Sequence, residues 1–223
     1  MKSEDIQKGR FGLEKEKADP LKASTVTFKF ICFKTPWNGL GRVPRKFYFH
    51  FKFFTFPAVK TATVQIKNPN EHATSGDDAG LKAGQPYYLG RVTPGNPTTL
   101  RKEDDTSHDP NLLAVTFSID PSMSRVPEEH GRLAEYLYDR FLTVDVFDAE
   151  SLFLYGTCKV PLFELLRQGA GSVVRAKECE MCDPESGDFR GAVQLIMTNV
   201  GSTPSVSFSD TAKAGGPRKV QPS

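Results

Sequence analysis

The sequence lacks the features that define several large functional classes. It contains no run of about 18 apolar residues, so no transmembrane helix is predicted. The N-terminal residues 1–20 have no apolar core, which argues against a secretory signal. The formal net charge is only +2, whereas nucleic-acid-binding domains usually carry a clear basic excess. These absences predict an intracellular, cytoplasmic protein with no nucleic-acid partner.

Catalytic and metal-binding motifs are also missing. The sequence has no glycine-rich phosphate-binding loop, no His-Glu-x-x-His and no Gly-x-Ser-x-Gly. Cys179-x-x-Cys182 supplies half of a zinc site, but structural zinc needs four ligands and no second cysteine or histidine pair follows. We therefore expect a non-catalytic protein with reduced thiols, no metal and no cofactor.

Phenylalanine, in contrast, is abundant, with 17 residues that cluster in stretches of alternating pattern. Residues 46–56 (KFYFHFKFFTF) place Phe47, Phe49, Phe51 and Phe53 on one face, and Tyr48, His50 and Lys52 on the other. Period-two alternation favours a core-facing strand over an aromatic platform that would stack single-stranded nucleic acid. Further strands are predicted at residues 25–33, 63–67, 87–92, 112–119, 142–147, 176–181 and 191–199.

Two short helices interrupt the strands. Pro127 suits a first helical turn, and Leu133, Tyr136 and Leu137 share one face of a helix ending near Arg140. A second helix of one or two turns is predicted over residues 162–167. Because strands and helices do not alternate regularly, the predicted fold is all-β: an antiparallel β-sandwich of about eight strands with one or two inserted helices.

Composition divides the chain into one domain with flanking segments. Residues 1–23 are rich in charge and poor in large apolar groups, which predicts a disordered tail. Residues 202–223 are rich in Ser, Gly, Pro and Lys, which predicts a flexible linker or tail. The folded domain is predicted over residues 24–201, with a mobile insertion within residues 68–111.

The most informative stretch is residues 142–162, LTVDVFDAESLFLYGTCKVPL. It predicts a strand, a loop that begins Asp148-Ala149-Glu150, an apolar tip from Leu152 to Tyr155, and a second short strand. This order of parts resembles the third loop of a C2 domain. With VDVFDAESL at 144–152, LLRQG at 165–169 and TNVG at 198–201, residues 24–201 resemble the C2-like domain of the nephrocystin-4 family.

The resemblance implies a C2-like fold and a place in a large, non-enzymatic scaffold of the ciliary transition zone and basal body. It implies a role in cilium assembly, with nephrocystin-1 and the RPGR-interacting-protein-like scaffold as partners. Members of the family are much longer than this chain, so we expect one internal domain or a fragment of a longer protein.

Calcium binding is not expected, although Asp148 and Glu150 occupy the position of C2 calcium ligands. Calcium takes six to eight oxygen ligands, which C2 domains collect from two adjacent loops. The first loop, residues 34–46, contains no acid and four bases: Lys34, Arg42, Arg45 and Lys46. We expect the two carboxylates to pair with these bases instead of holding a dication.

The candidate contact surface is therefore the loop tip, Leu152, Phe153, Leu154 and Tyr155, with the four bases as its rim. The preferred hypothesis is a protein contact, or packing of Phe153 and Tyr155 under a neighbouring loop or domain. The alternative is calcium-independent binding to an anionic membrane, in which each basic residue near the surface contributes about 1 kcal/mol.

Overall fold

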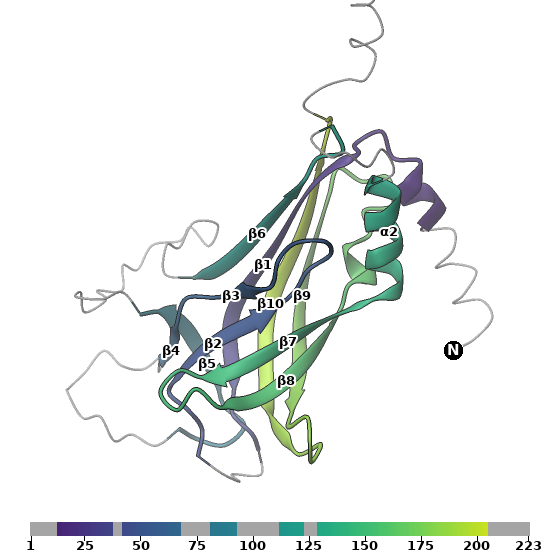
Figure 1. Ribbon diagram of the computed structural model, residues 1–223. Coiled ribbons are helices and arrows are strands. Elements are labelled where there is room, and N and C mark those ends of the chain that lie inside the picture. Colours follow the sequence, from purple (N-terminus) through teal and green to yellow (C-terminus); the bar gives the residue numbers. More distant parts are fainter. Residues whose placement is uncertain (1–12, 38–41, 68–80, 93–111, 123–128, 205–223) are drawn as a thin grey trace, which may run out of the picture.

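The computed structural model describes residues 13–37, 42–67, 81–92, 112–122 and 129–204. Strands wrapped around a phenylalanine-rich core make up most of this part of the chain (Figure 1). The strands are β1 (Ala23–Lys34), β2 (Lys46–Phe51), β3 (Val59–Lys60), β4 (Val64–Lys67), β5 (Pro86–Arg91), β6 (Leu113–Ile119), β7 (Phe141–Asp148), β8 (Leu154–Pro161), β9 (Ser172–Cys182) and β10 (Phe189–Ser202).

The ten strands form one antiparallel sheet that closes on itself. The order β10-β9-β8-β7-β2-β4-β5-β1-β6 is completed by pairing of β10 with β1, which closes a barrel-like sandwich. One edge of β1 pairs with β10, and the other pairs first with β6 and then with β5. The pairing between β8 and β9 is short, with two residue pairs. The predicted all-β, C2-like antiparallel sandwich is confirmed.

The alternating phenylalanines of β1 and β2 form the centre of the core. Phe28, Phe30, Phe47 and Phe49 are fully buried, and the rings of Phe30 and Phe49 stack with centroids 4.2 Å apart. Such an aromatic pair contributes roughly 0.5–1.5 kcal/mol beyond the burial of its area. The alternation in the sequence therefore determines which side chains of β1 and β2 face the interior of the barrel.

The predicted strand over residues 46–56 ends earlier than expected. β2 stops at Phe51 because the chain then turns, and Phe54 has a positive φ of 49°, which does not continue a strand. The outer face is also less polar than the pattern suggests. Tyr48 is buried and stacks on Phe147, with centroids 5.0 Å apart and an interplanar angle of 2°.

Helix α2 (Glu129–Asp139) packs against the barrel and leads directly into β7 (Figure 1). Leu133 and Leu137 are buried, and Tyr136 meets Phe53 edge-on. The predicted start of this helix at Pro127 lies outside the described residues. The second predicted helix is a single 3₁₀ turn, η1 (Phe163–Leu165), because the backbone of Leu166 is already extended.

The prediction of a disordered tail over residues 1–23 is wrong for residues 13–23, the last of which begins β1. Residues 13–17 are helical, and the side chains of Glu16 and Asp19 are buried against Arg167. Composition suggested a solvated segment because it does not reveal that a distant cation pairs with these acids. Residues 1–12, the tail over 205–223, and residues 68–80 and 93–111 of the predicted insertion lie outside the described residues. Between those last two stretches, β5 is an integral strand of the barrel.

Candidate functional site

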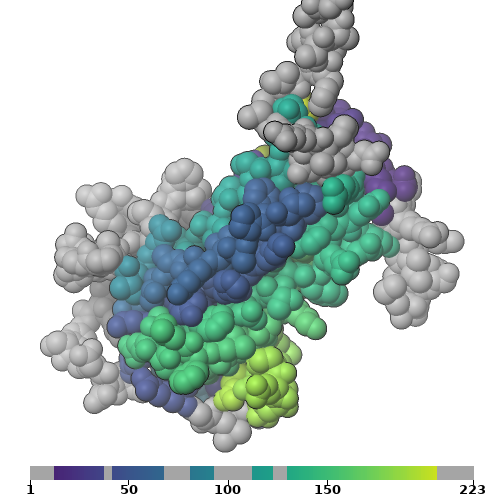
Figure 2. Space-filling view, viewed as in Figure 1, coloured from purple at the N-terminus to yellow at the C-terminus, as the bar shows by residue number. Residues whose placement is uncertain are grey.

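The β7–β8 hairpin presents an apolar tip to solvent. The exposed fractions are 63% for Leu152, 76% for Phe153 and 39% for Leu154. Leu152 adopts a left-handed backbone conformation, with φ of 63°, and its N–H donates to the carbonyl of Asp148 at 2.9 Å. The tight turn leaves these side chains at least partly exposed at one end of the barrel, where the space-filling view shows the hairpin beside the β9–β10 turn (Figure 2). Adjacent exposed apolar groups of this size commonly mark a contact surface.

Tyr155 differs from its neighbours and does not belong to the exposed tip. Its ring is half-buried and lies against Phe33 and Phe47, with centroid separations of 6.3 and 5.8 Å. Its hydroxyl donates to the carbonyl oxygen of Arg190 at 3.2 Å, and burial raises the pKa of Tyr155 to about 12. The four-residue tip predicted from the sequence is thus a three-residue tip with an aromatic anchor.

The Asp148 side chain forms hydrogen bonds within its own loop. Its carboxylate accepts hydrogen bonds from the Glu150 N–H at 2.9 Å and from the Ser151 hydroxyl at 2.7 Å. Burial raises the pKa of Asp148, but these hydrogen bonds outweigh that effect and lower it. The carboxylate therefore stays ionised and holds the turn in shape.

Glu150 binds the basic rim. Its carboxylate oxygens lie 3.4 Å from Arg42 Nη2 and 3.3 Å from Lys46 Nζ, so the expected pairing of loop carboxylate with rim bases is confirmed for this residue. Arg45 lies between these two bases in sequence, immediately before β2, and its backbone carbonyl accepts the N–H of Ile66 at 2.9 Å. The acid reduces the net positive charge beside the tip.

Lys34 pairs with an acid other than Glu150. Its ammonium lies 3.1 Å from the Glu178 carboxylate on β9, so it faces the β9–β10 side of the barrel. The structure therefore brings Arg42 and Lys46 to the hairpin, whereas Lys34 lies on a different surface.

No group of three or more His, Cys, Asp or Glu in the described part of the chain is arranged to hold a metal ion. Cys179 and Cys182 do not form a chelating pair, because residues three apart on a strand point to opposite faces. Cys179 is buried, and burial raises its pKa to about 11; burial likewise raises the pKa of Cys158 to about 12. These buried thiols are protonated at neutral pH.

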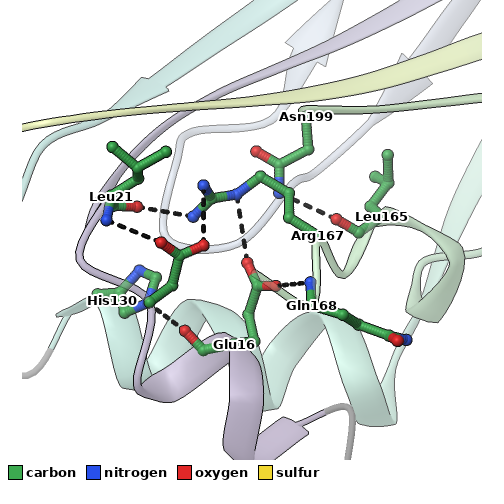
Figure 3. A network of polar contacts seen from close by, with 8 residues as sticks. Glu16, Leu21, His130, Leu165, Arg167, Gln168 and Asn199 are labelled. Carbon is green, nitrogen blue, oxygen red and sulfur yellow. Dashed lines mark hydrogen bonds and ion pairs between the residues drawn. The ribbon is translucent and has the colours of Figure 1, made fainter. Parts of the chain in front are cut away.

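A buried polar network at the opposite end of the barrel was not predicted (Figure 3). The Arg167 side chain is 0% exposed; its Nε lies 3.4 Å from Glu16 Oε1 and its Nη1 lies 3.2 Å from Asp19 Oδ2. Arg167 Nη2 also donates to the carbonyl of Leu21 at 2.7 Å. The acids are held in turn, since Glu16 accepts the N–H of Gln168 and Asp19 accepts the N–H of Leu21.

This network ties four elements together. His130 of α2 lies with its Nε2 2.8 Å from the carbonyl oxygen of Glu16, and Asn199 of β10 donates to the carbonyl of Leu165 in η1 at 3.0 Å. The one sequence signal was the arginine that follows two leucines in LLRQG, and its partner could not be inferred from spacing. The buried network joins residues 13–22 to the domain.

Comparison with known proteins gives a consistent result. The family model "Nephrocystin-4 C2 third domain" matches residues 3–210. Nephrocystin-4 of Xenopus laevis is 25% identical over 218 residues, covering 87% of this chain and 14% of that protein. Nephrocystin-4 of Homo sapiens is 28% identical over 197 residues, covering 81% of this chain and 12% of that protein. The chain thus spans a small fraction of the length of these relatives.

Proposed function

The chain belongs to the nephrocystin-4 family, in the region of its third C2 domain, and we propose that it is a non-catalytic protein-interaction module. In this proposal it serves a scaffold of the ciliary transition zone and basal body during cilium assembly. Its partners are nephrocystin-1 and the RPGR-interacting-protein-like scaffold. Family membership supports the proposed role in a ciliary scaffold. The exposed hairpin tip supports binding to a protein partner.

The observation that carries the proposal is the exposed apolar tip on a fixed hairpin. Leu152 and Phe153 project into solvent, while Tyr155 anchors the next strand in the core. The Ala149 N–H donates to the carbonyl of Lys46 at 2.9 Å, which fastens the loop to β2. A preformed surface loses little conformational entropy on binding, and buried large side chains supply most of the energy of a protein interface.

Charge favours a protein over an anionic membrane as the partner. A basic residue contributes about 1 kcal/mol near an anionic surface, and the Glu150 carboxylate between Arg42 and Lys46 offsets part of that attraction. Asp148 adds a second negative charge in the same loop, since its lowered pKa keeps it ionised. The calcium-independent lipid-binding alternative therefore has weaker support than a protein contact.

The proposal is tested with a Leu152→Ser, Phe153→Ser double variant of the full chain in ciliated cells. Proximity labelling and pull-down with the wild type should retrieve nephrocystin-1 or the RPGR-interacting-protein-like scaffold, and the double variant should lose that retrieval. Val174→Ser is the matched control, because Val174 is also apolar and 58% exposed but lies on β9. Equal retrieval by the double variant and the wild type would refute the proposed role of the tip.

Co-sedimentation with liposomes that contain anionic phospholipid tests the alternative. We expect little pelleting of the wild type and no change in the double variant. Strong pelleting of the wild type that the double variant abolishes would establish the membrane alternative instead.

A further inference from the structure

A second candidate contact surface lies at the same end of the barrel, separate from the hairpin tip. It is an open groove of about 360 Å³ between the end of β1, the segment before β5, and the β9–β10 hairpin. Its lining residues are Lys34, Thr35, Trp37, Gly84, Glu178, Glu180, Phe189 and Ala192. Trp37 is the one tryptophan of the chain, and it is 73% exposed. A large aromatic side chain left in water beside a groove is typical of an interaction surface.

The aromatic wall of this groove is held in place. Thr35 is buried, its hydroxyl donates to the carbonyl of Lys82 at 2.6 Å, and its N–H donates to the carbonyl of Gln85 at 3.1 Å. These bonds join the segment carrying Trp37 to the loop that precedes β5. The Trp37 ring lies beside Phe189, with centroids 6.5 Å apart and an interplanar angle of 30°. The groove therefore presents a preformed aromatic surface.

The facing wall carries acidic side chains of β9. Glu178 and Glu180 flank the buried Cys179, so both point to the outer face of the strand. Glu178 accepts hydrogen bonds from Gln194 at 2.8 Å and from Lys34 at 3.1 Å. Within the described part of the chain, no hydrogen bond or ion pair occupies the carboxylate of Glu180. With two carboxylates and one ammonium, the groove carries excess negative charge next to an exposed aromatic ring.

We propose that this groove binds an arginine side chain of a protein partner, with the guanidinium against Trp37 and hydrogen-bonded to Glu180. Arginine fits both walls, because its planar cation stacks on aromatic faces and its fork of N–H donors matches a carboxylate. An acidic ligand would meet Glu180 unfavourably, and a purely apolar one would leave that carboxylate without compensation. This site goes beyond the proposed function and does not depend on the hairpin tip.

Fluorescence of Trp37 tests the proposal directly, since no other tryptophan contributes to the signal. The full chain is titrated at low salt with an end-blocked tetra-arginine peptide, and with tetra-lysine and tetra-glutamate peptides of the same length. We expect a saturable change with tetra-arginine, at least five-fold weaker binding of tetra-lysine, and none with tetra-glutamate. A flat titration with tetra-arginine, or equal binding of tetra-lysine, would overturn the assignment.

Glu180→Gln should weaken tetra-arginine binding at least five-fold while leaving the far-UV circular dichroism spectrum unchanged, because the side chain is exposed. Glu185→Gln is the matched control: it removes an exposed carboxylate from the adjacent β9–β10 turn and should leave the affinity unchanged. If both substitutions weaken binding equally, the peptide senses only general charge and the assigned site is wrong. Failure of this experiment leaves the hairpin proposal standing, because none of the hairpin-tip residues Leu152, Phe153 and Leu154 lines the groove.

Discussion

Two ion clusters at opposite ends of the barrel have similar distances and contrasting surroundings. At one end Arg167 lies between Glu16 and Asp19, at 3.4 and 3.2 Å, with side chains 0–2% exposed. At the other end Glu150 lies between Arg42 and Lys46, at 3.4 and 3.3 Å, with side chains 40–81% exposed. One cation between two acids is mirrored by one acid between two cations.

Because the distances are alike, burial is what distinguishes the two ion clusters. In water the attraction between the rim charges is screened, so a surface pair typically contributes 0–1 kcal/mol. In the interior each charge has lost its hydration, so removing one member leaves another stranded, at a cost of about 3–5 kcal/mol. The Arg167 cluster is therefore part of what holds the fold together, while the Glu150 cluster shapes the charge of a contact surface.

The largest effect is expected for Arg167→Met. The substitution leaves the Glu16 and Asp19 carboxylates buried without their cation, so the free energy of unfolding should fall by about 3–5 kcal/mol. Urea denaturation at neutral pH, followed by circular dichroism, measures it. A loss below about 1 kcal/mol would mean that the buried cluster contributes no more to stability than a surface ion pair, which would contradict the proposed difference between the two clusters.

A triple variant separates charge from packing. Glu16→Gln, Asp19→Asn and Arg167→Met together remove all three charges and keep acceptors for the N–H groups of Gln168 and Leu21. We expect it to recover most of the stability lost in Arg167→Met, because uncharged replacements of buried ion clusters are often neutral. No recovery would show that packing of the arginine side chain, not its charge, was lost.

A smaller loss is expected when residues 1–22 are removed. The deletion takes away both acids, but it also opens Arg167 to water, which restores part of its hydration. We expect a decrease of about 1–3 kcal/mol in the free energy of unfolding, again by urea denaturation. An unchanged unfolding midpoint would mean that this segment behaves as the solvated tail that its composition suggests.

Glu150→Gln should have little effect on stability. Because the rim is exposed and screened, the free energy of unfolding should change by less than about 1 kcal/mol. The same urea experiment run beside Arg167→Met makes the comparison direct. A loss of about 3 kcal/mol would show that the exposed cluster is structural as well.

The smallest effect is a pH dependence at the β9–β10 turn. Hydrogen bonds from Arg190 and from the N–H groups of Glu185 and Ser186 lower the pKa of Asp183 to about 2. Because the folded pKa lies below that of the unfolded chain, the stabilisation is complete above about pH 4 and disappears as the pH falls toward 2. Asp183→Asn should make stability less dependent on pH in this window. An Asp183 pKa near 4 by NMR titration would contradict the turn geometry.

The sequence predicted the features that depend on local pattern. Alternation in β1 and β2 is a property of successive residues, so the buried faces around Phe28 and Phe49 followed from it, as did the strand–loop–strand order of β7 and β8. The pairing of Glu150 with nearby bases followed from the contrast between an acidic and a basic loop.

Features that depend on distant partners could not be predicted. The acids at Glu16 and Asp19 are buried only because Arg167 lies about 150 positions away, and no periodicity encodes that separation. Tyr155 follows three exposed apolar residues, and only the packing of its ring on Phe33 and Phe47 separates it from them. A role for Trp37 could not be predicted, because a single tryptophan in a loop forms no repeating pattern.

The claim that the exposed hairpin tip serves partner binding and contributes little to stability is tested most directly on one variant. Leu152→Ser, Phe153→Ser is assayed both for its free energy of unfolding and for capture of nephrocystin-1 and the RPGR-interacting-protein-like scaffold. We predict a stability within about 0.5 kcal/mol of the wild type, together with loss of capture. Capture at the wild-type level by this stable variant would contradict the claim.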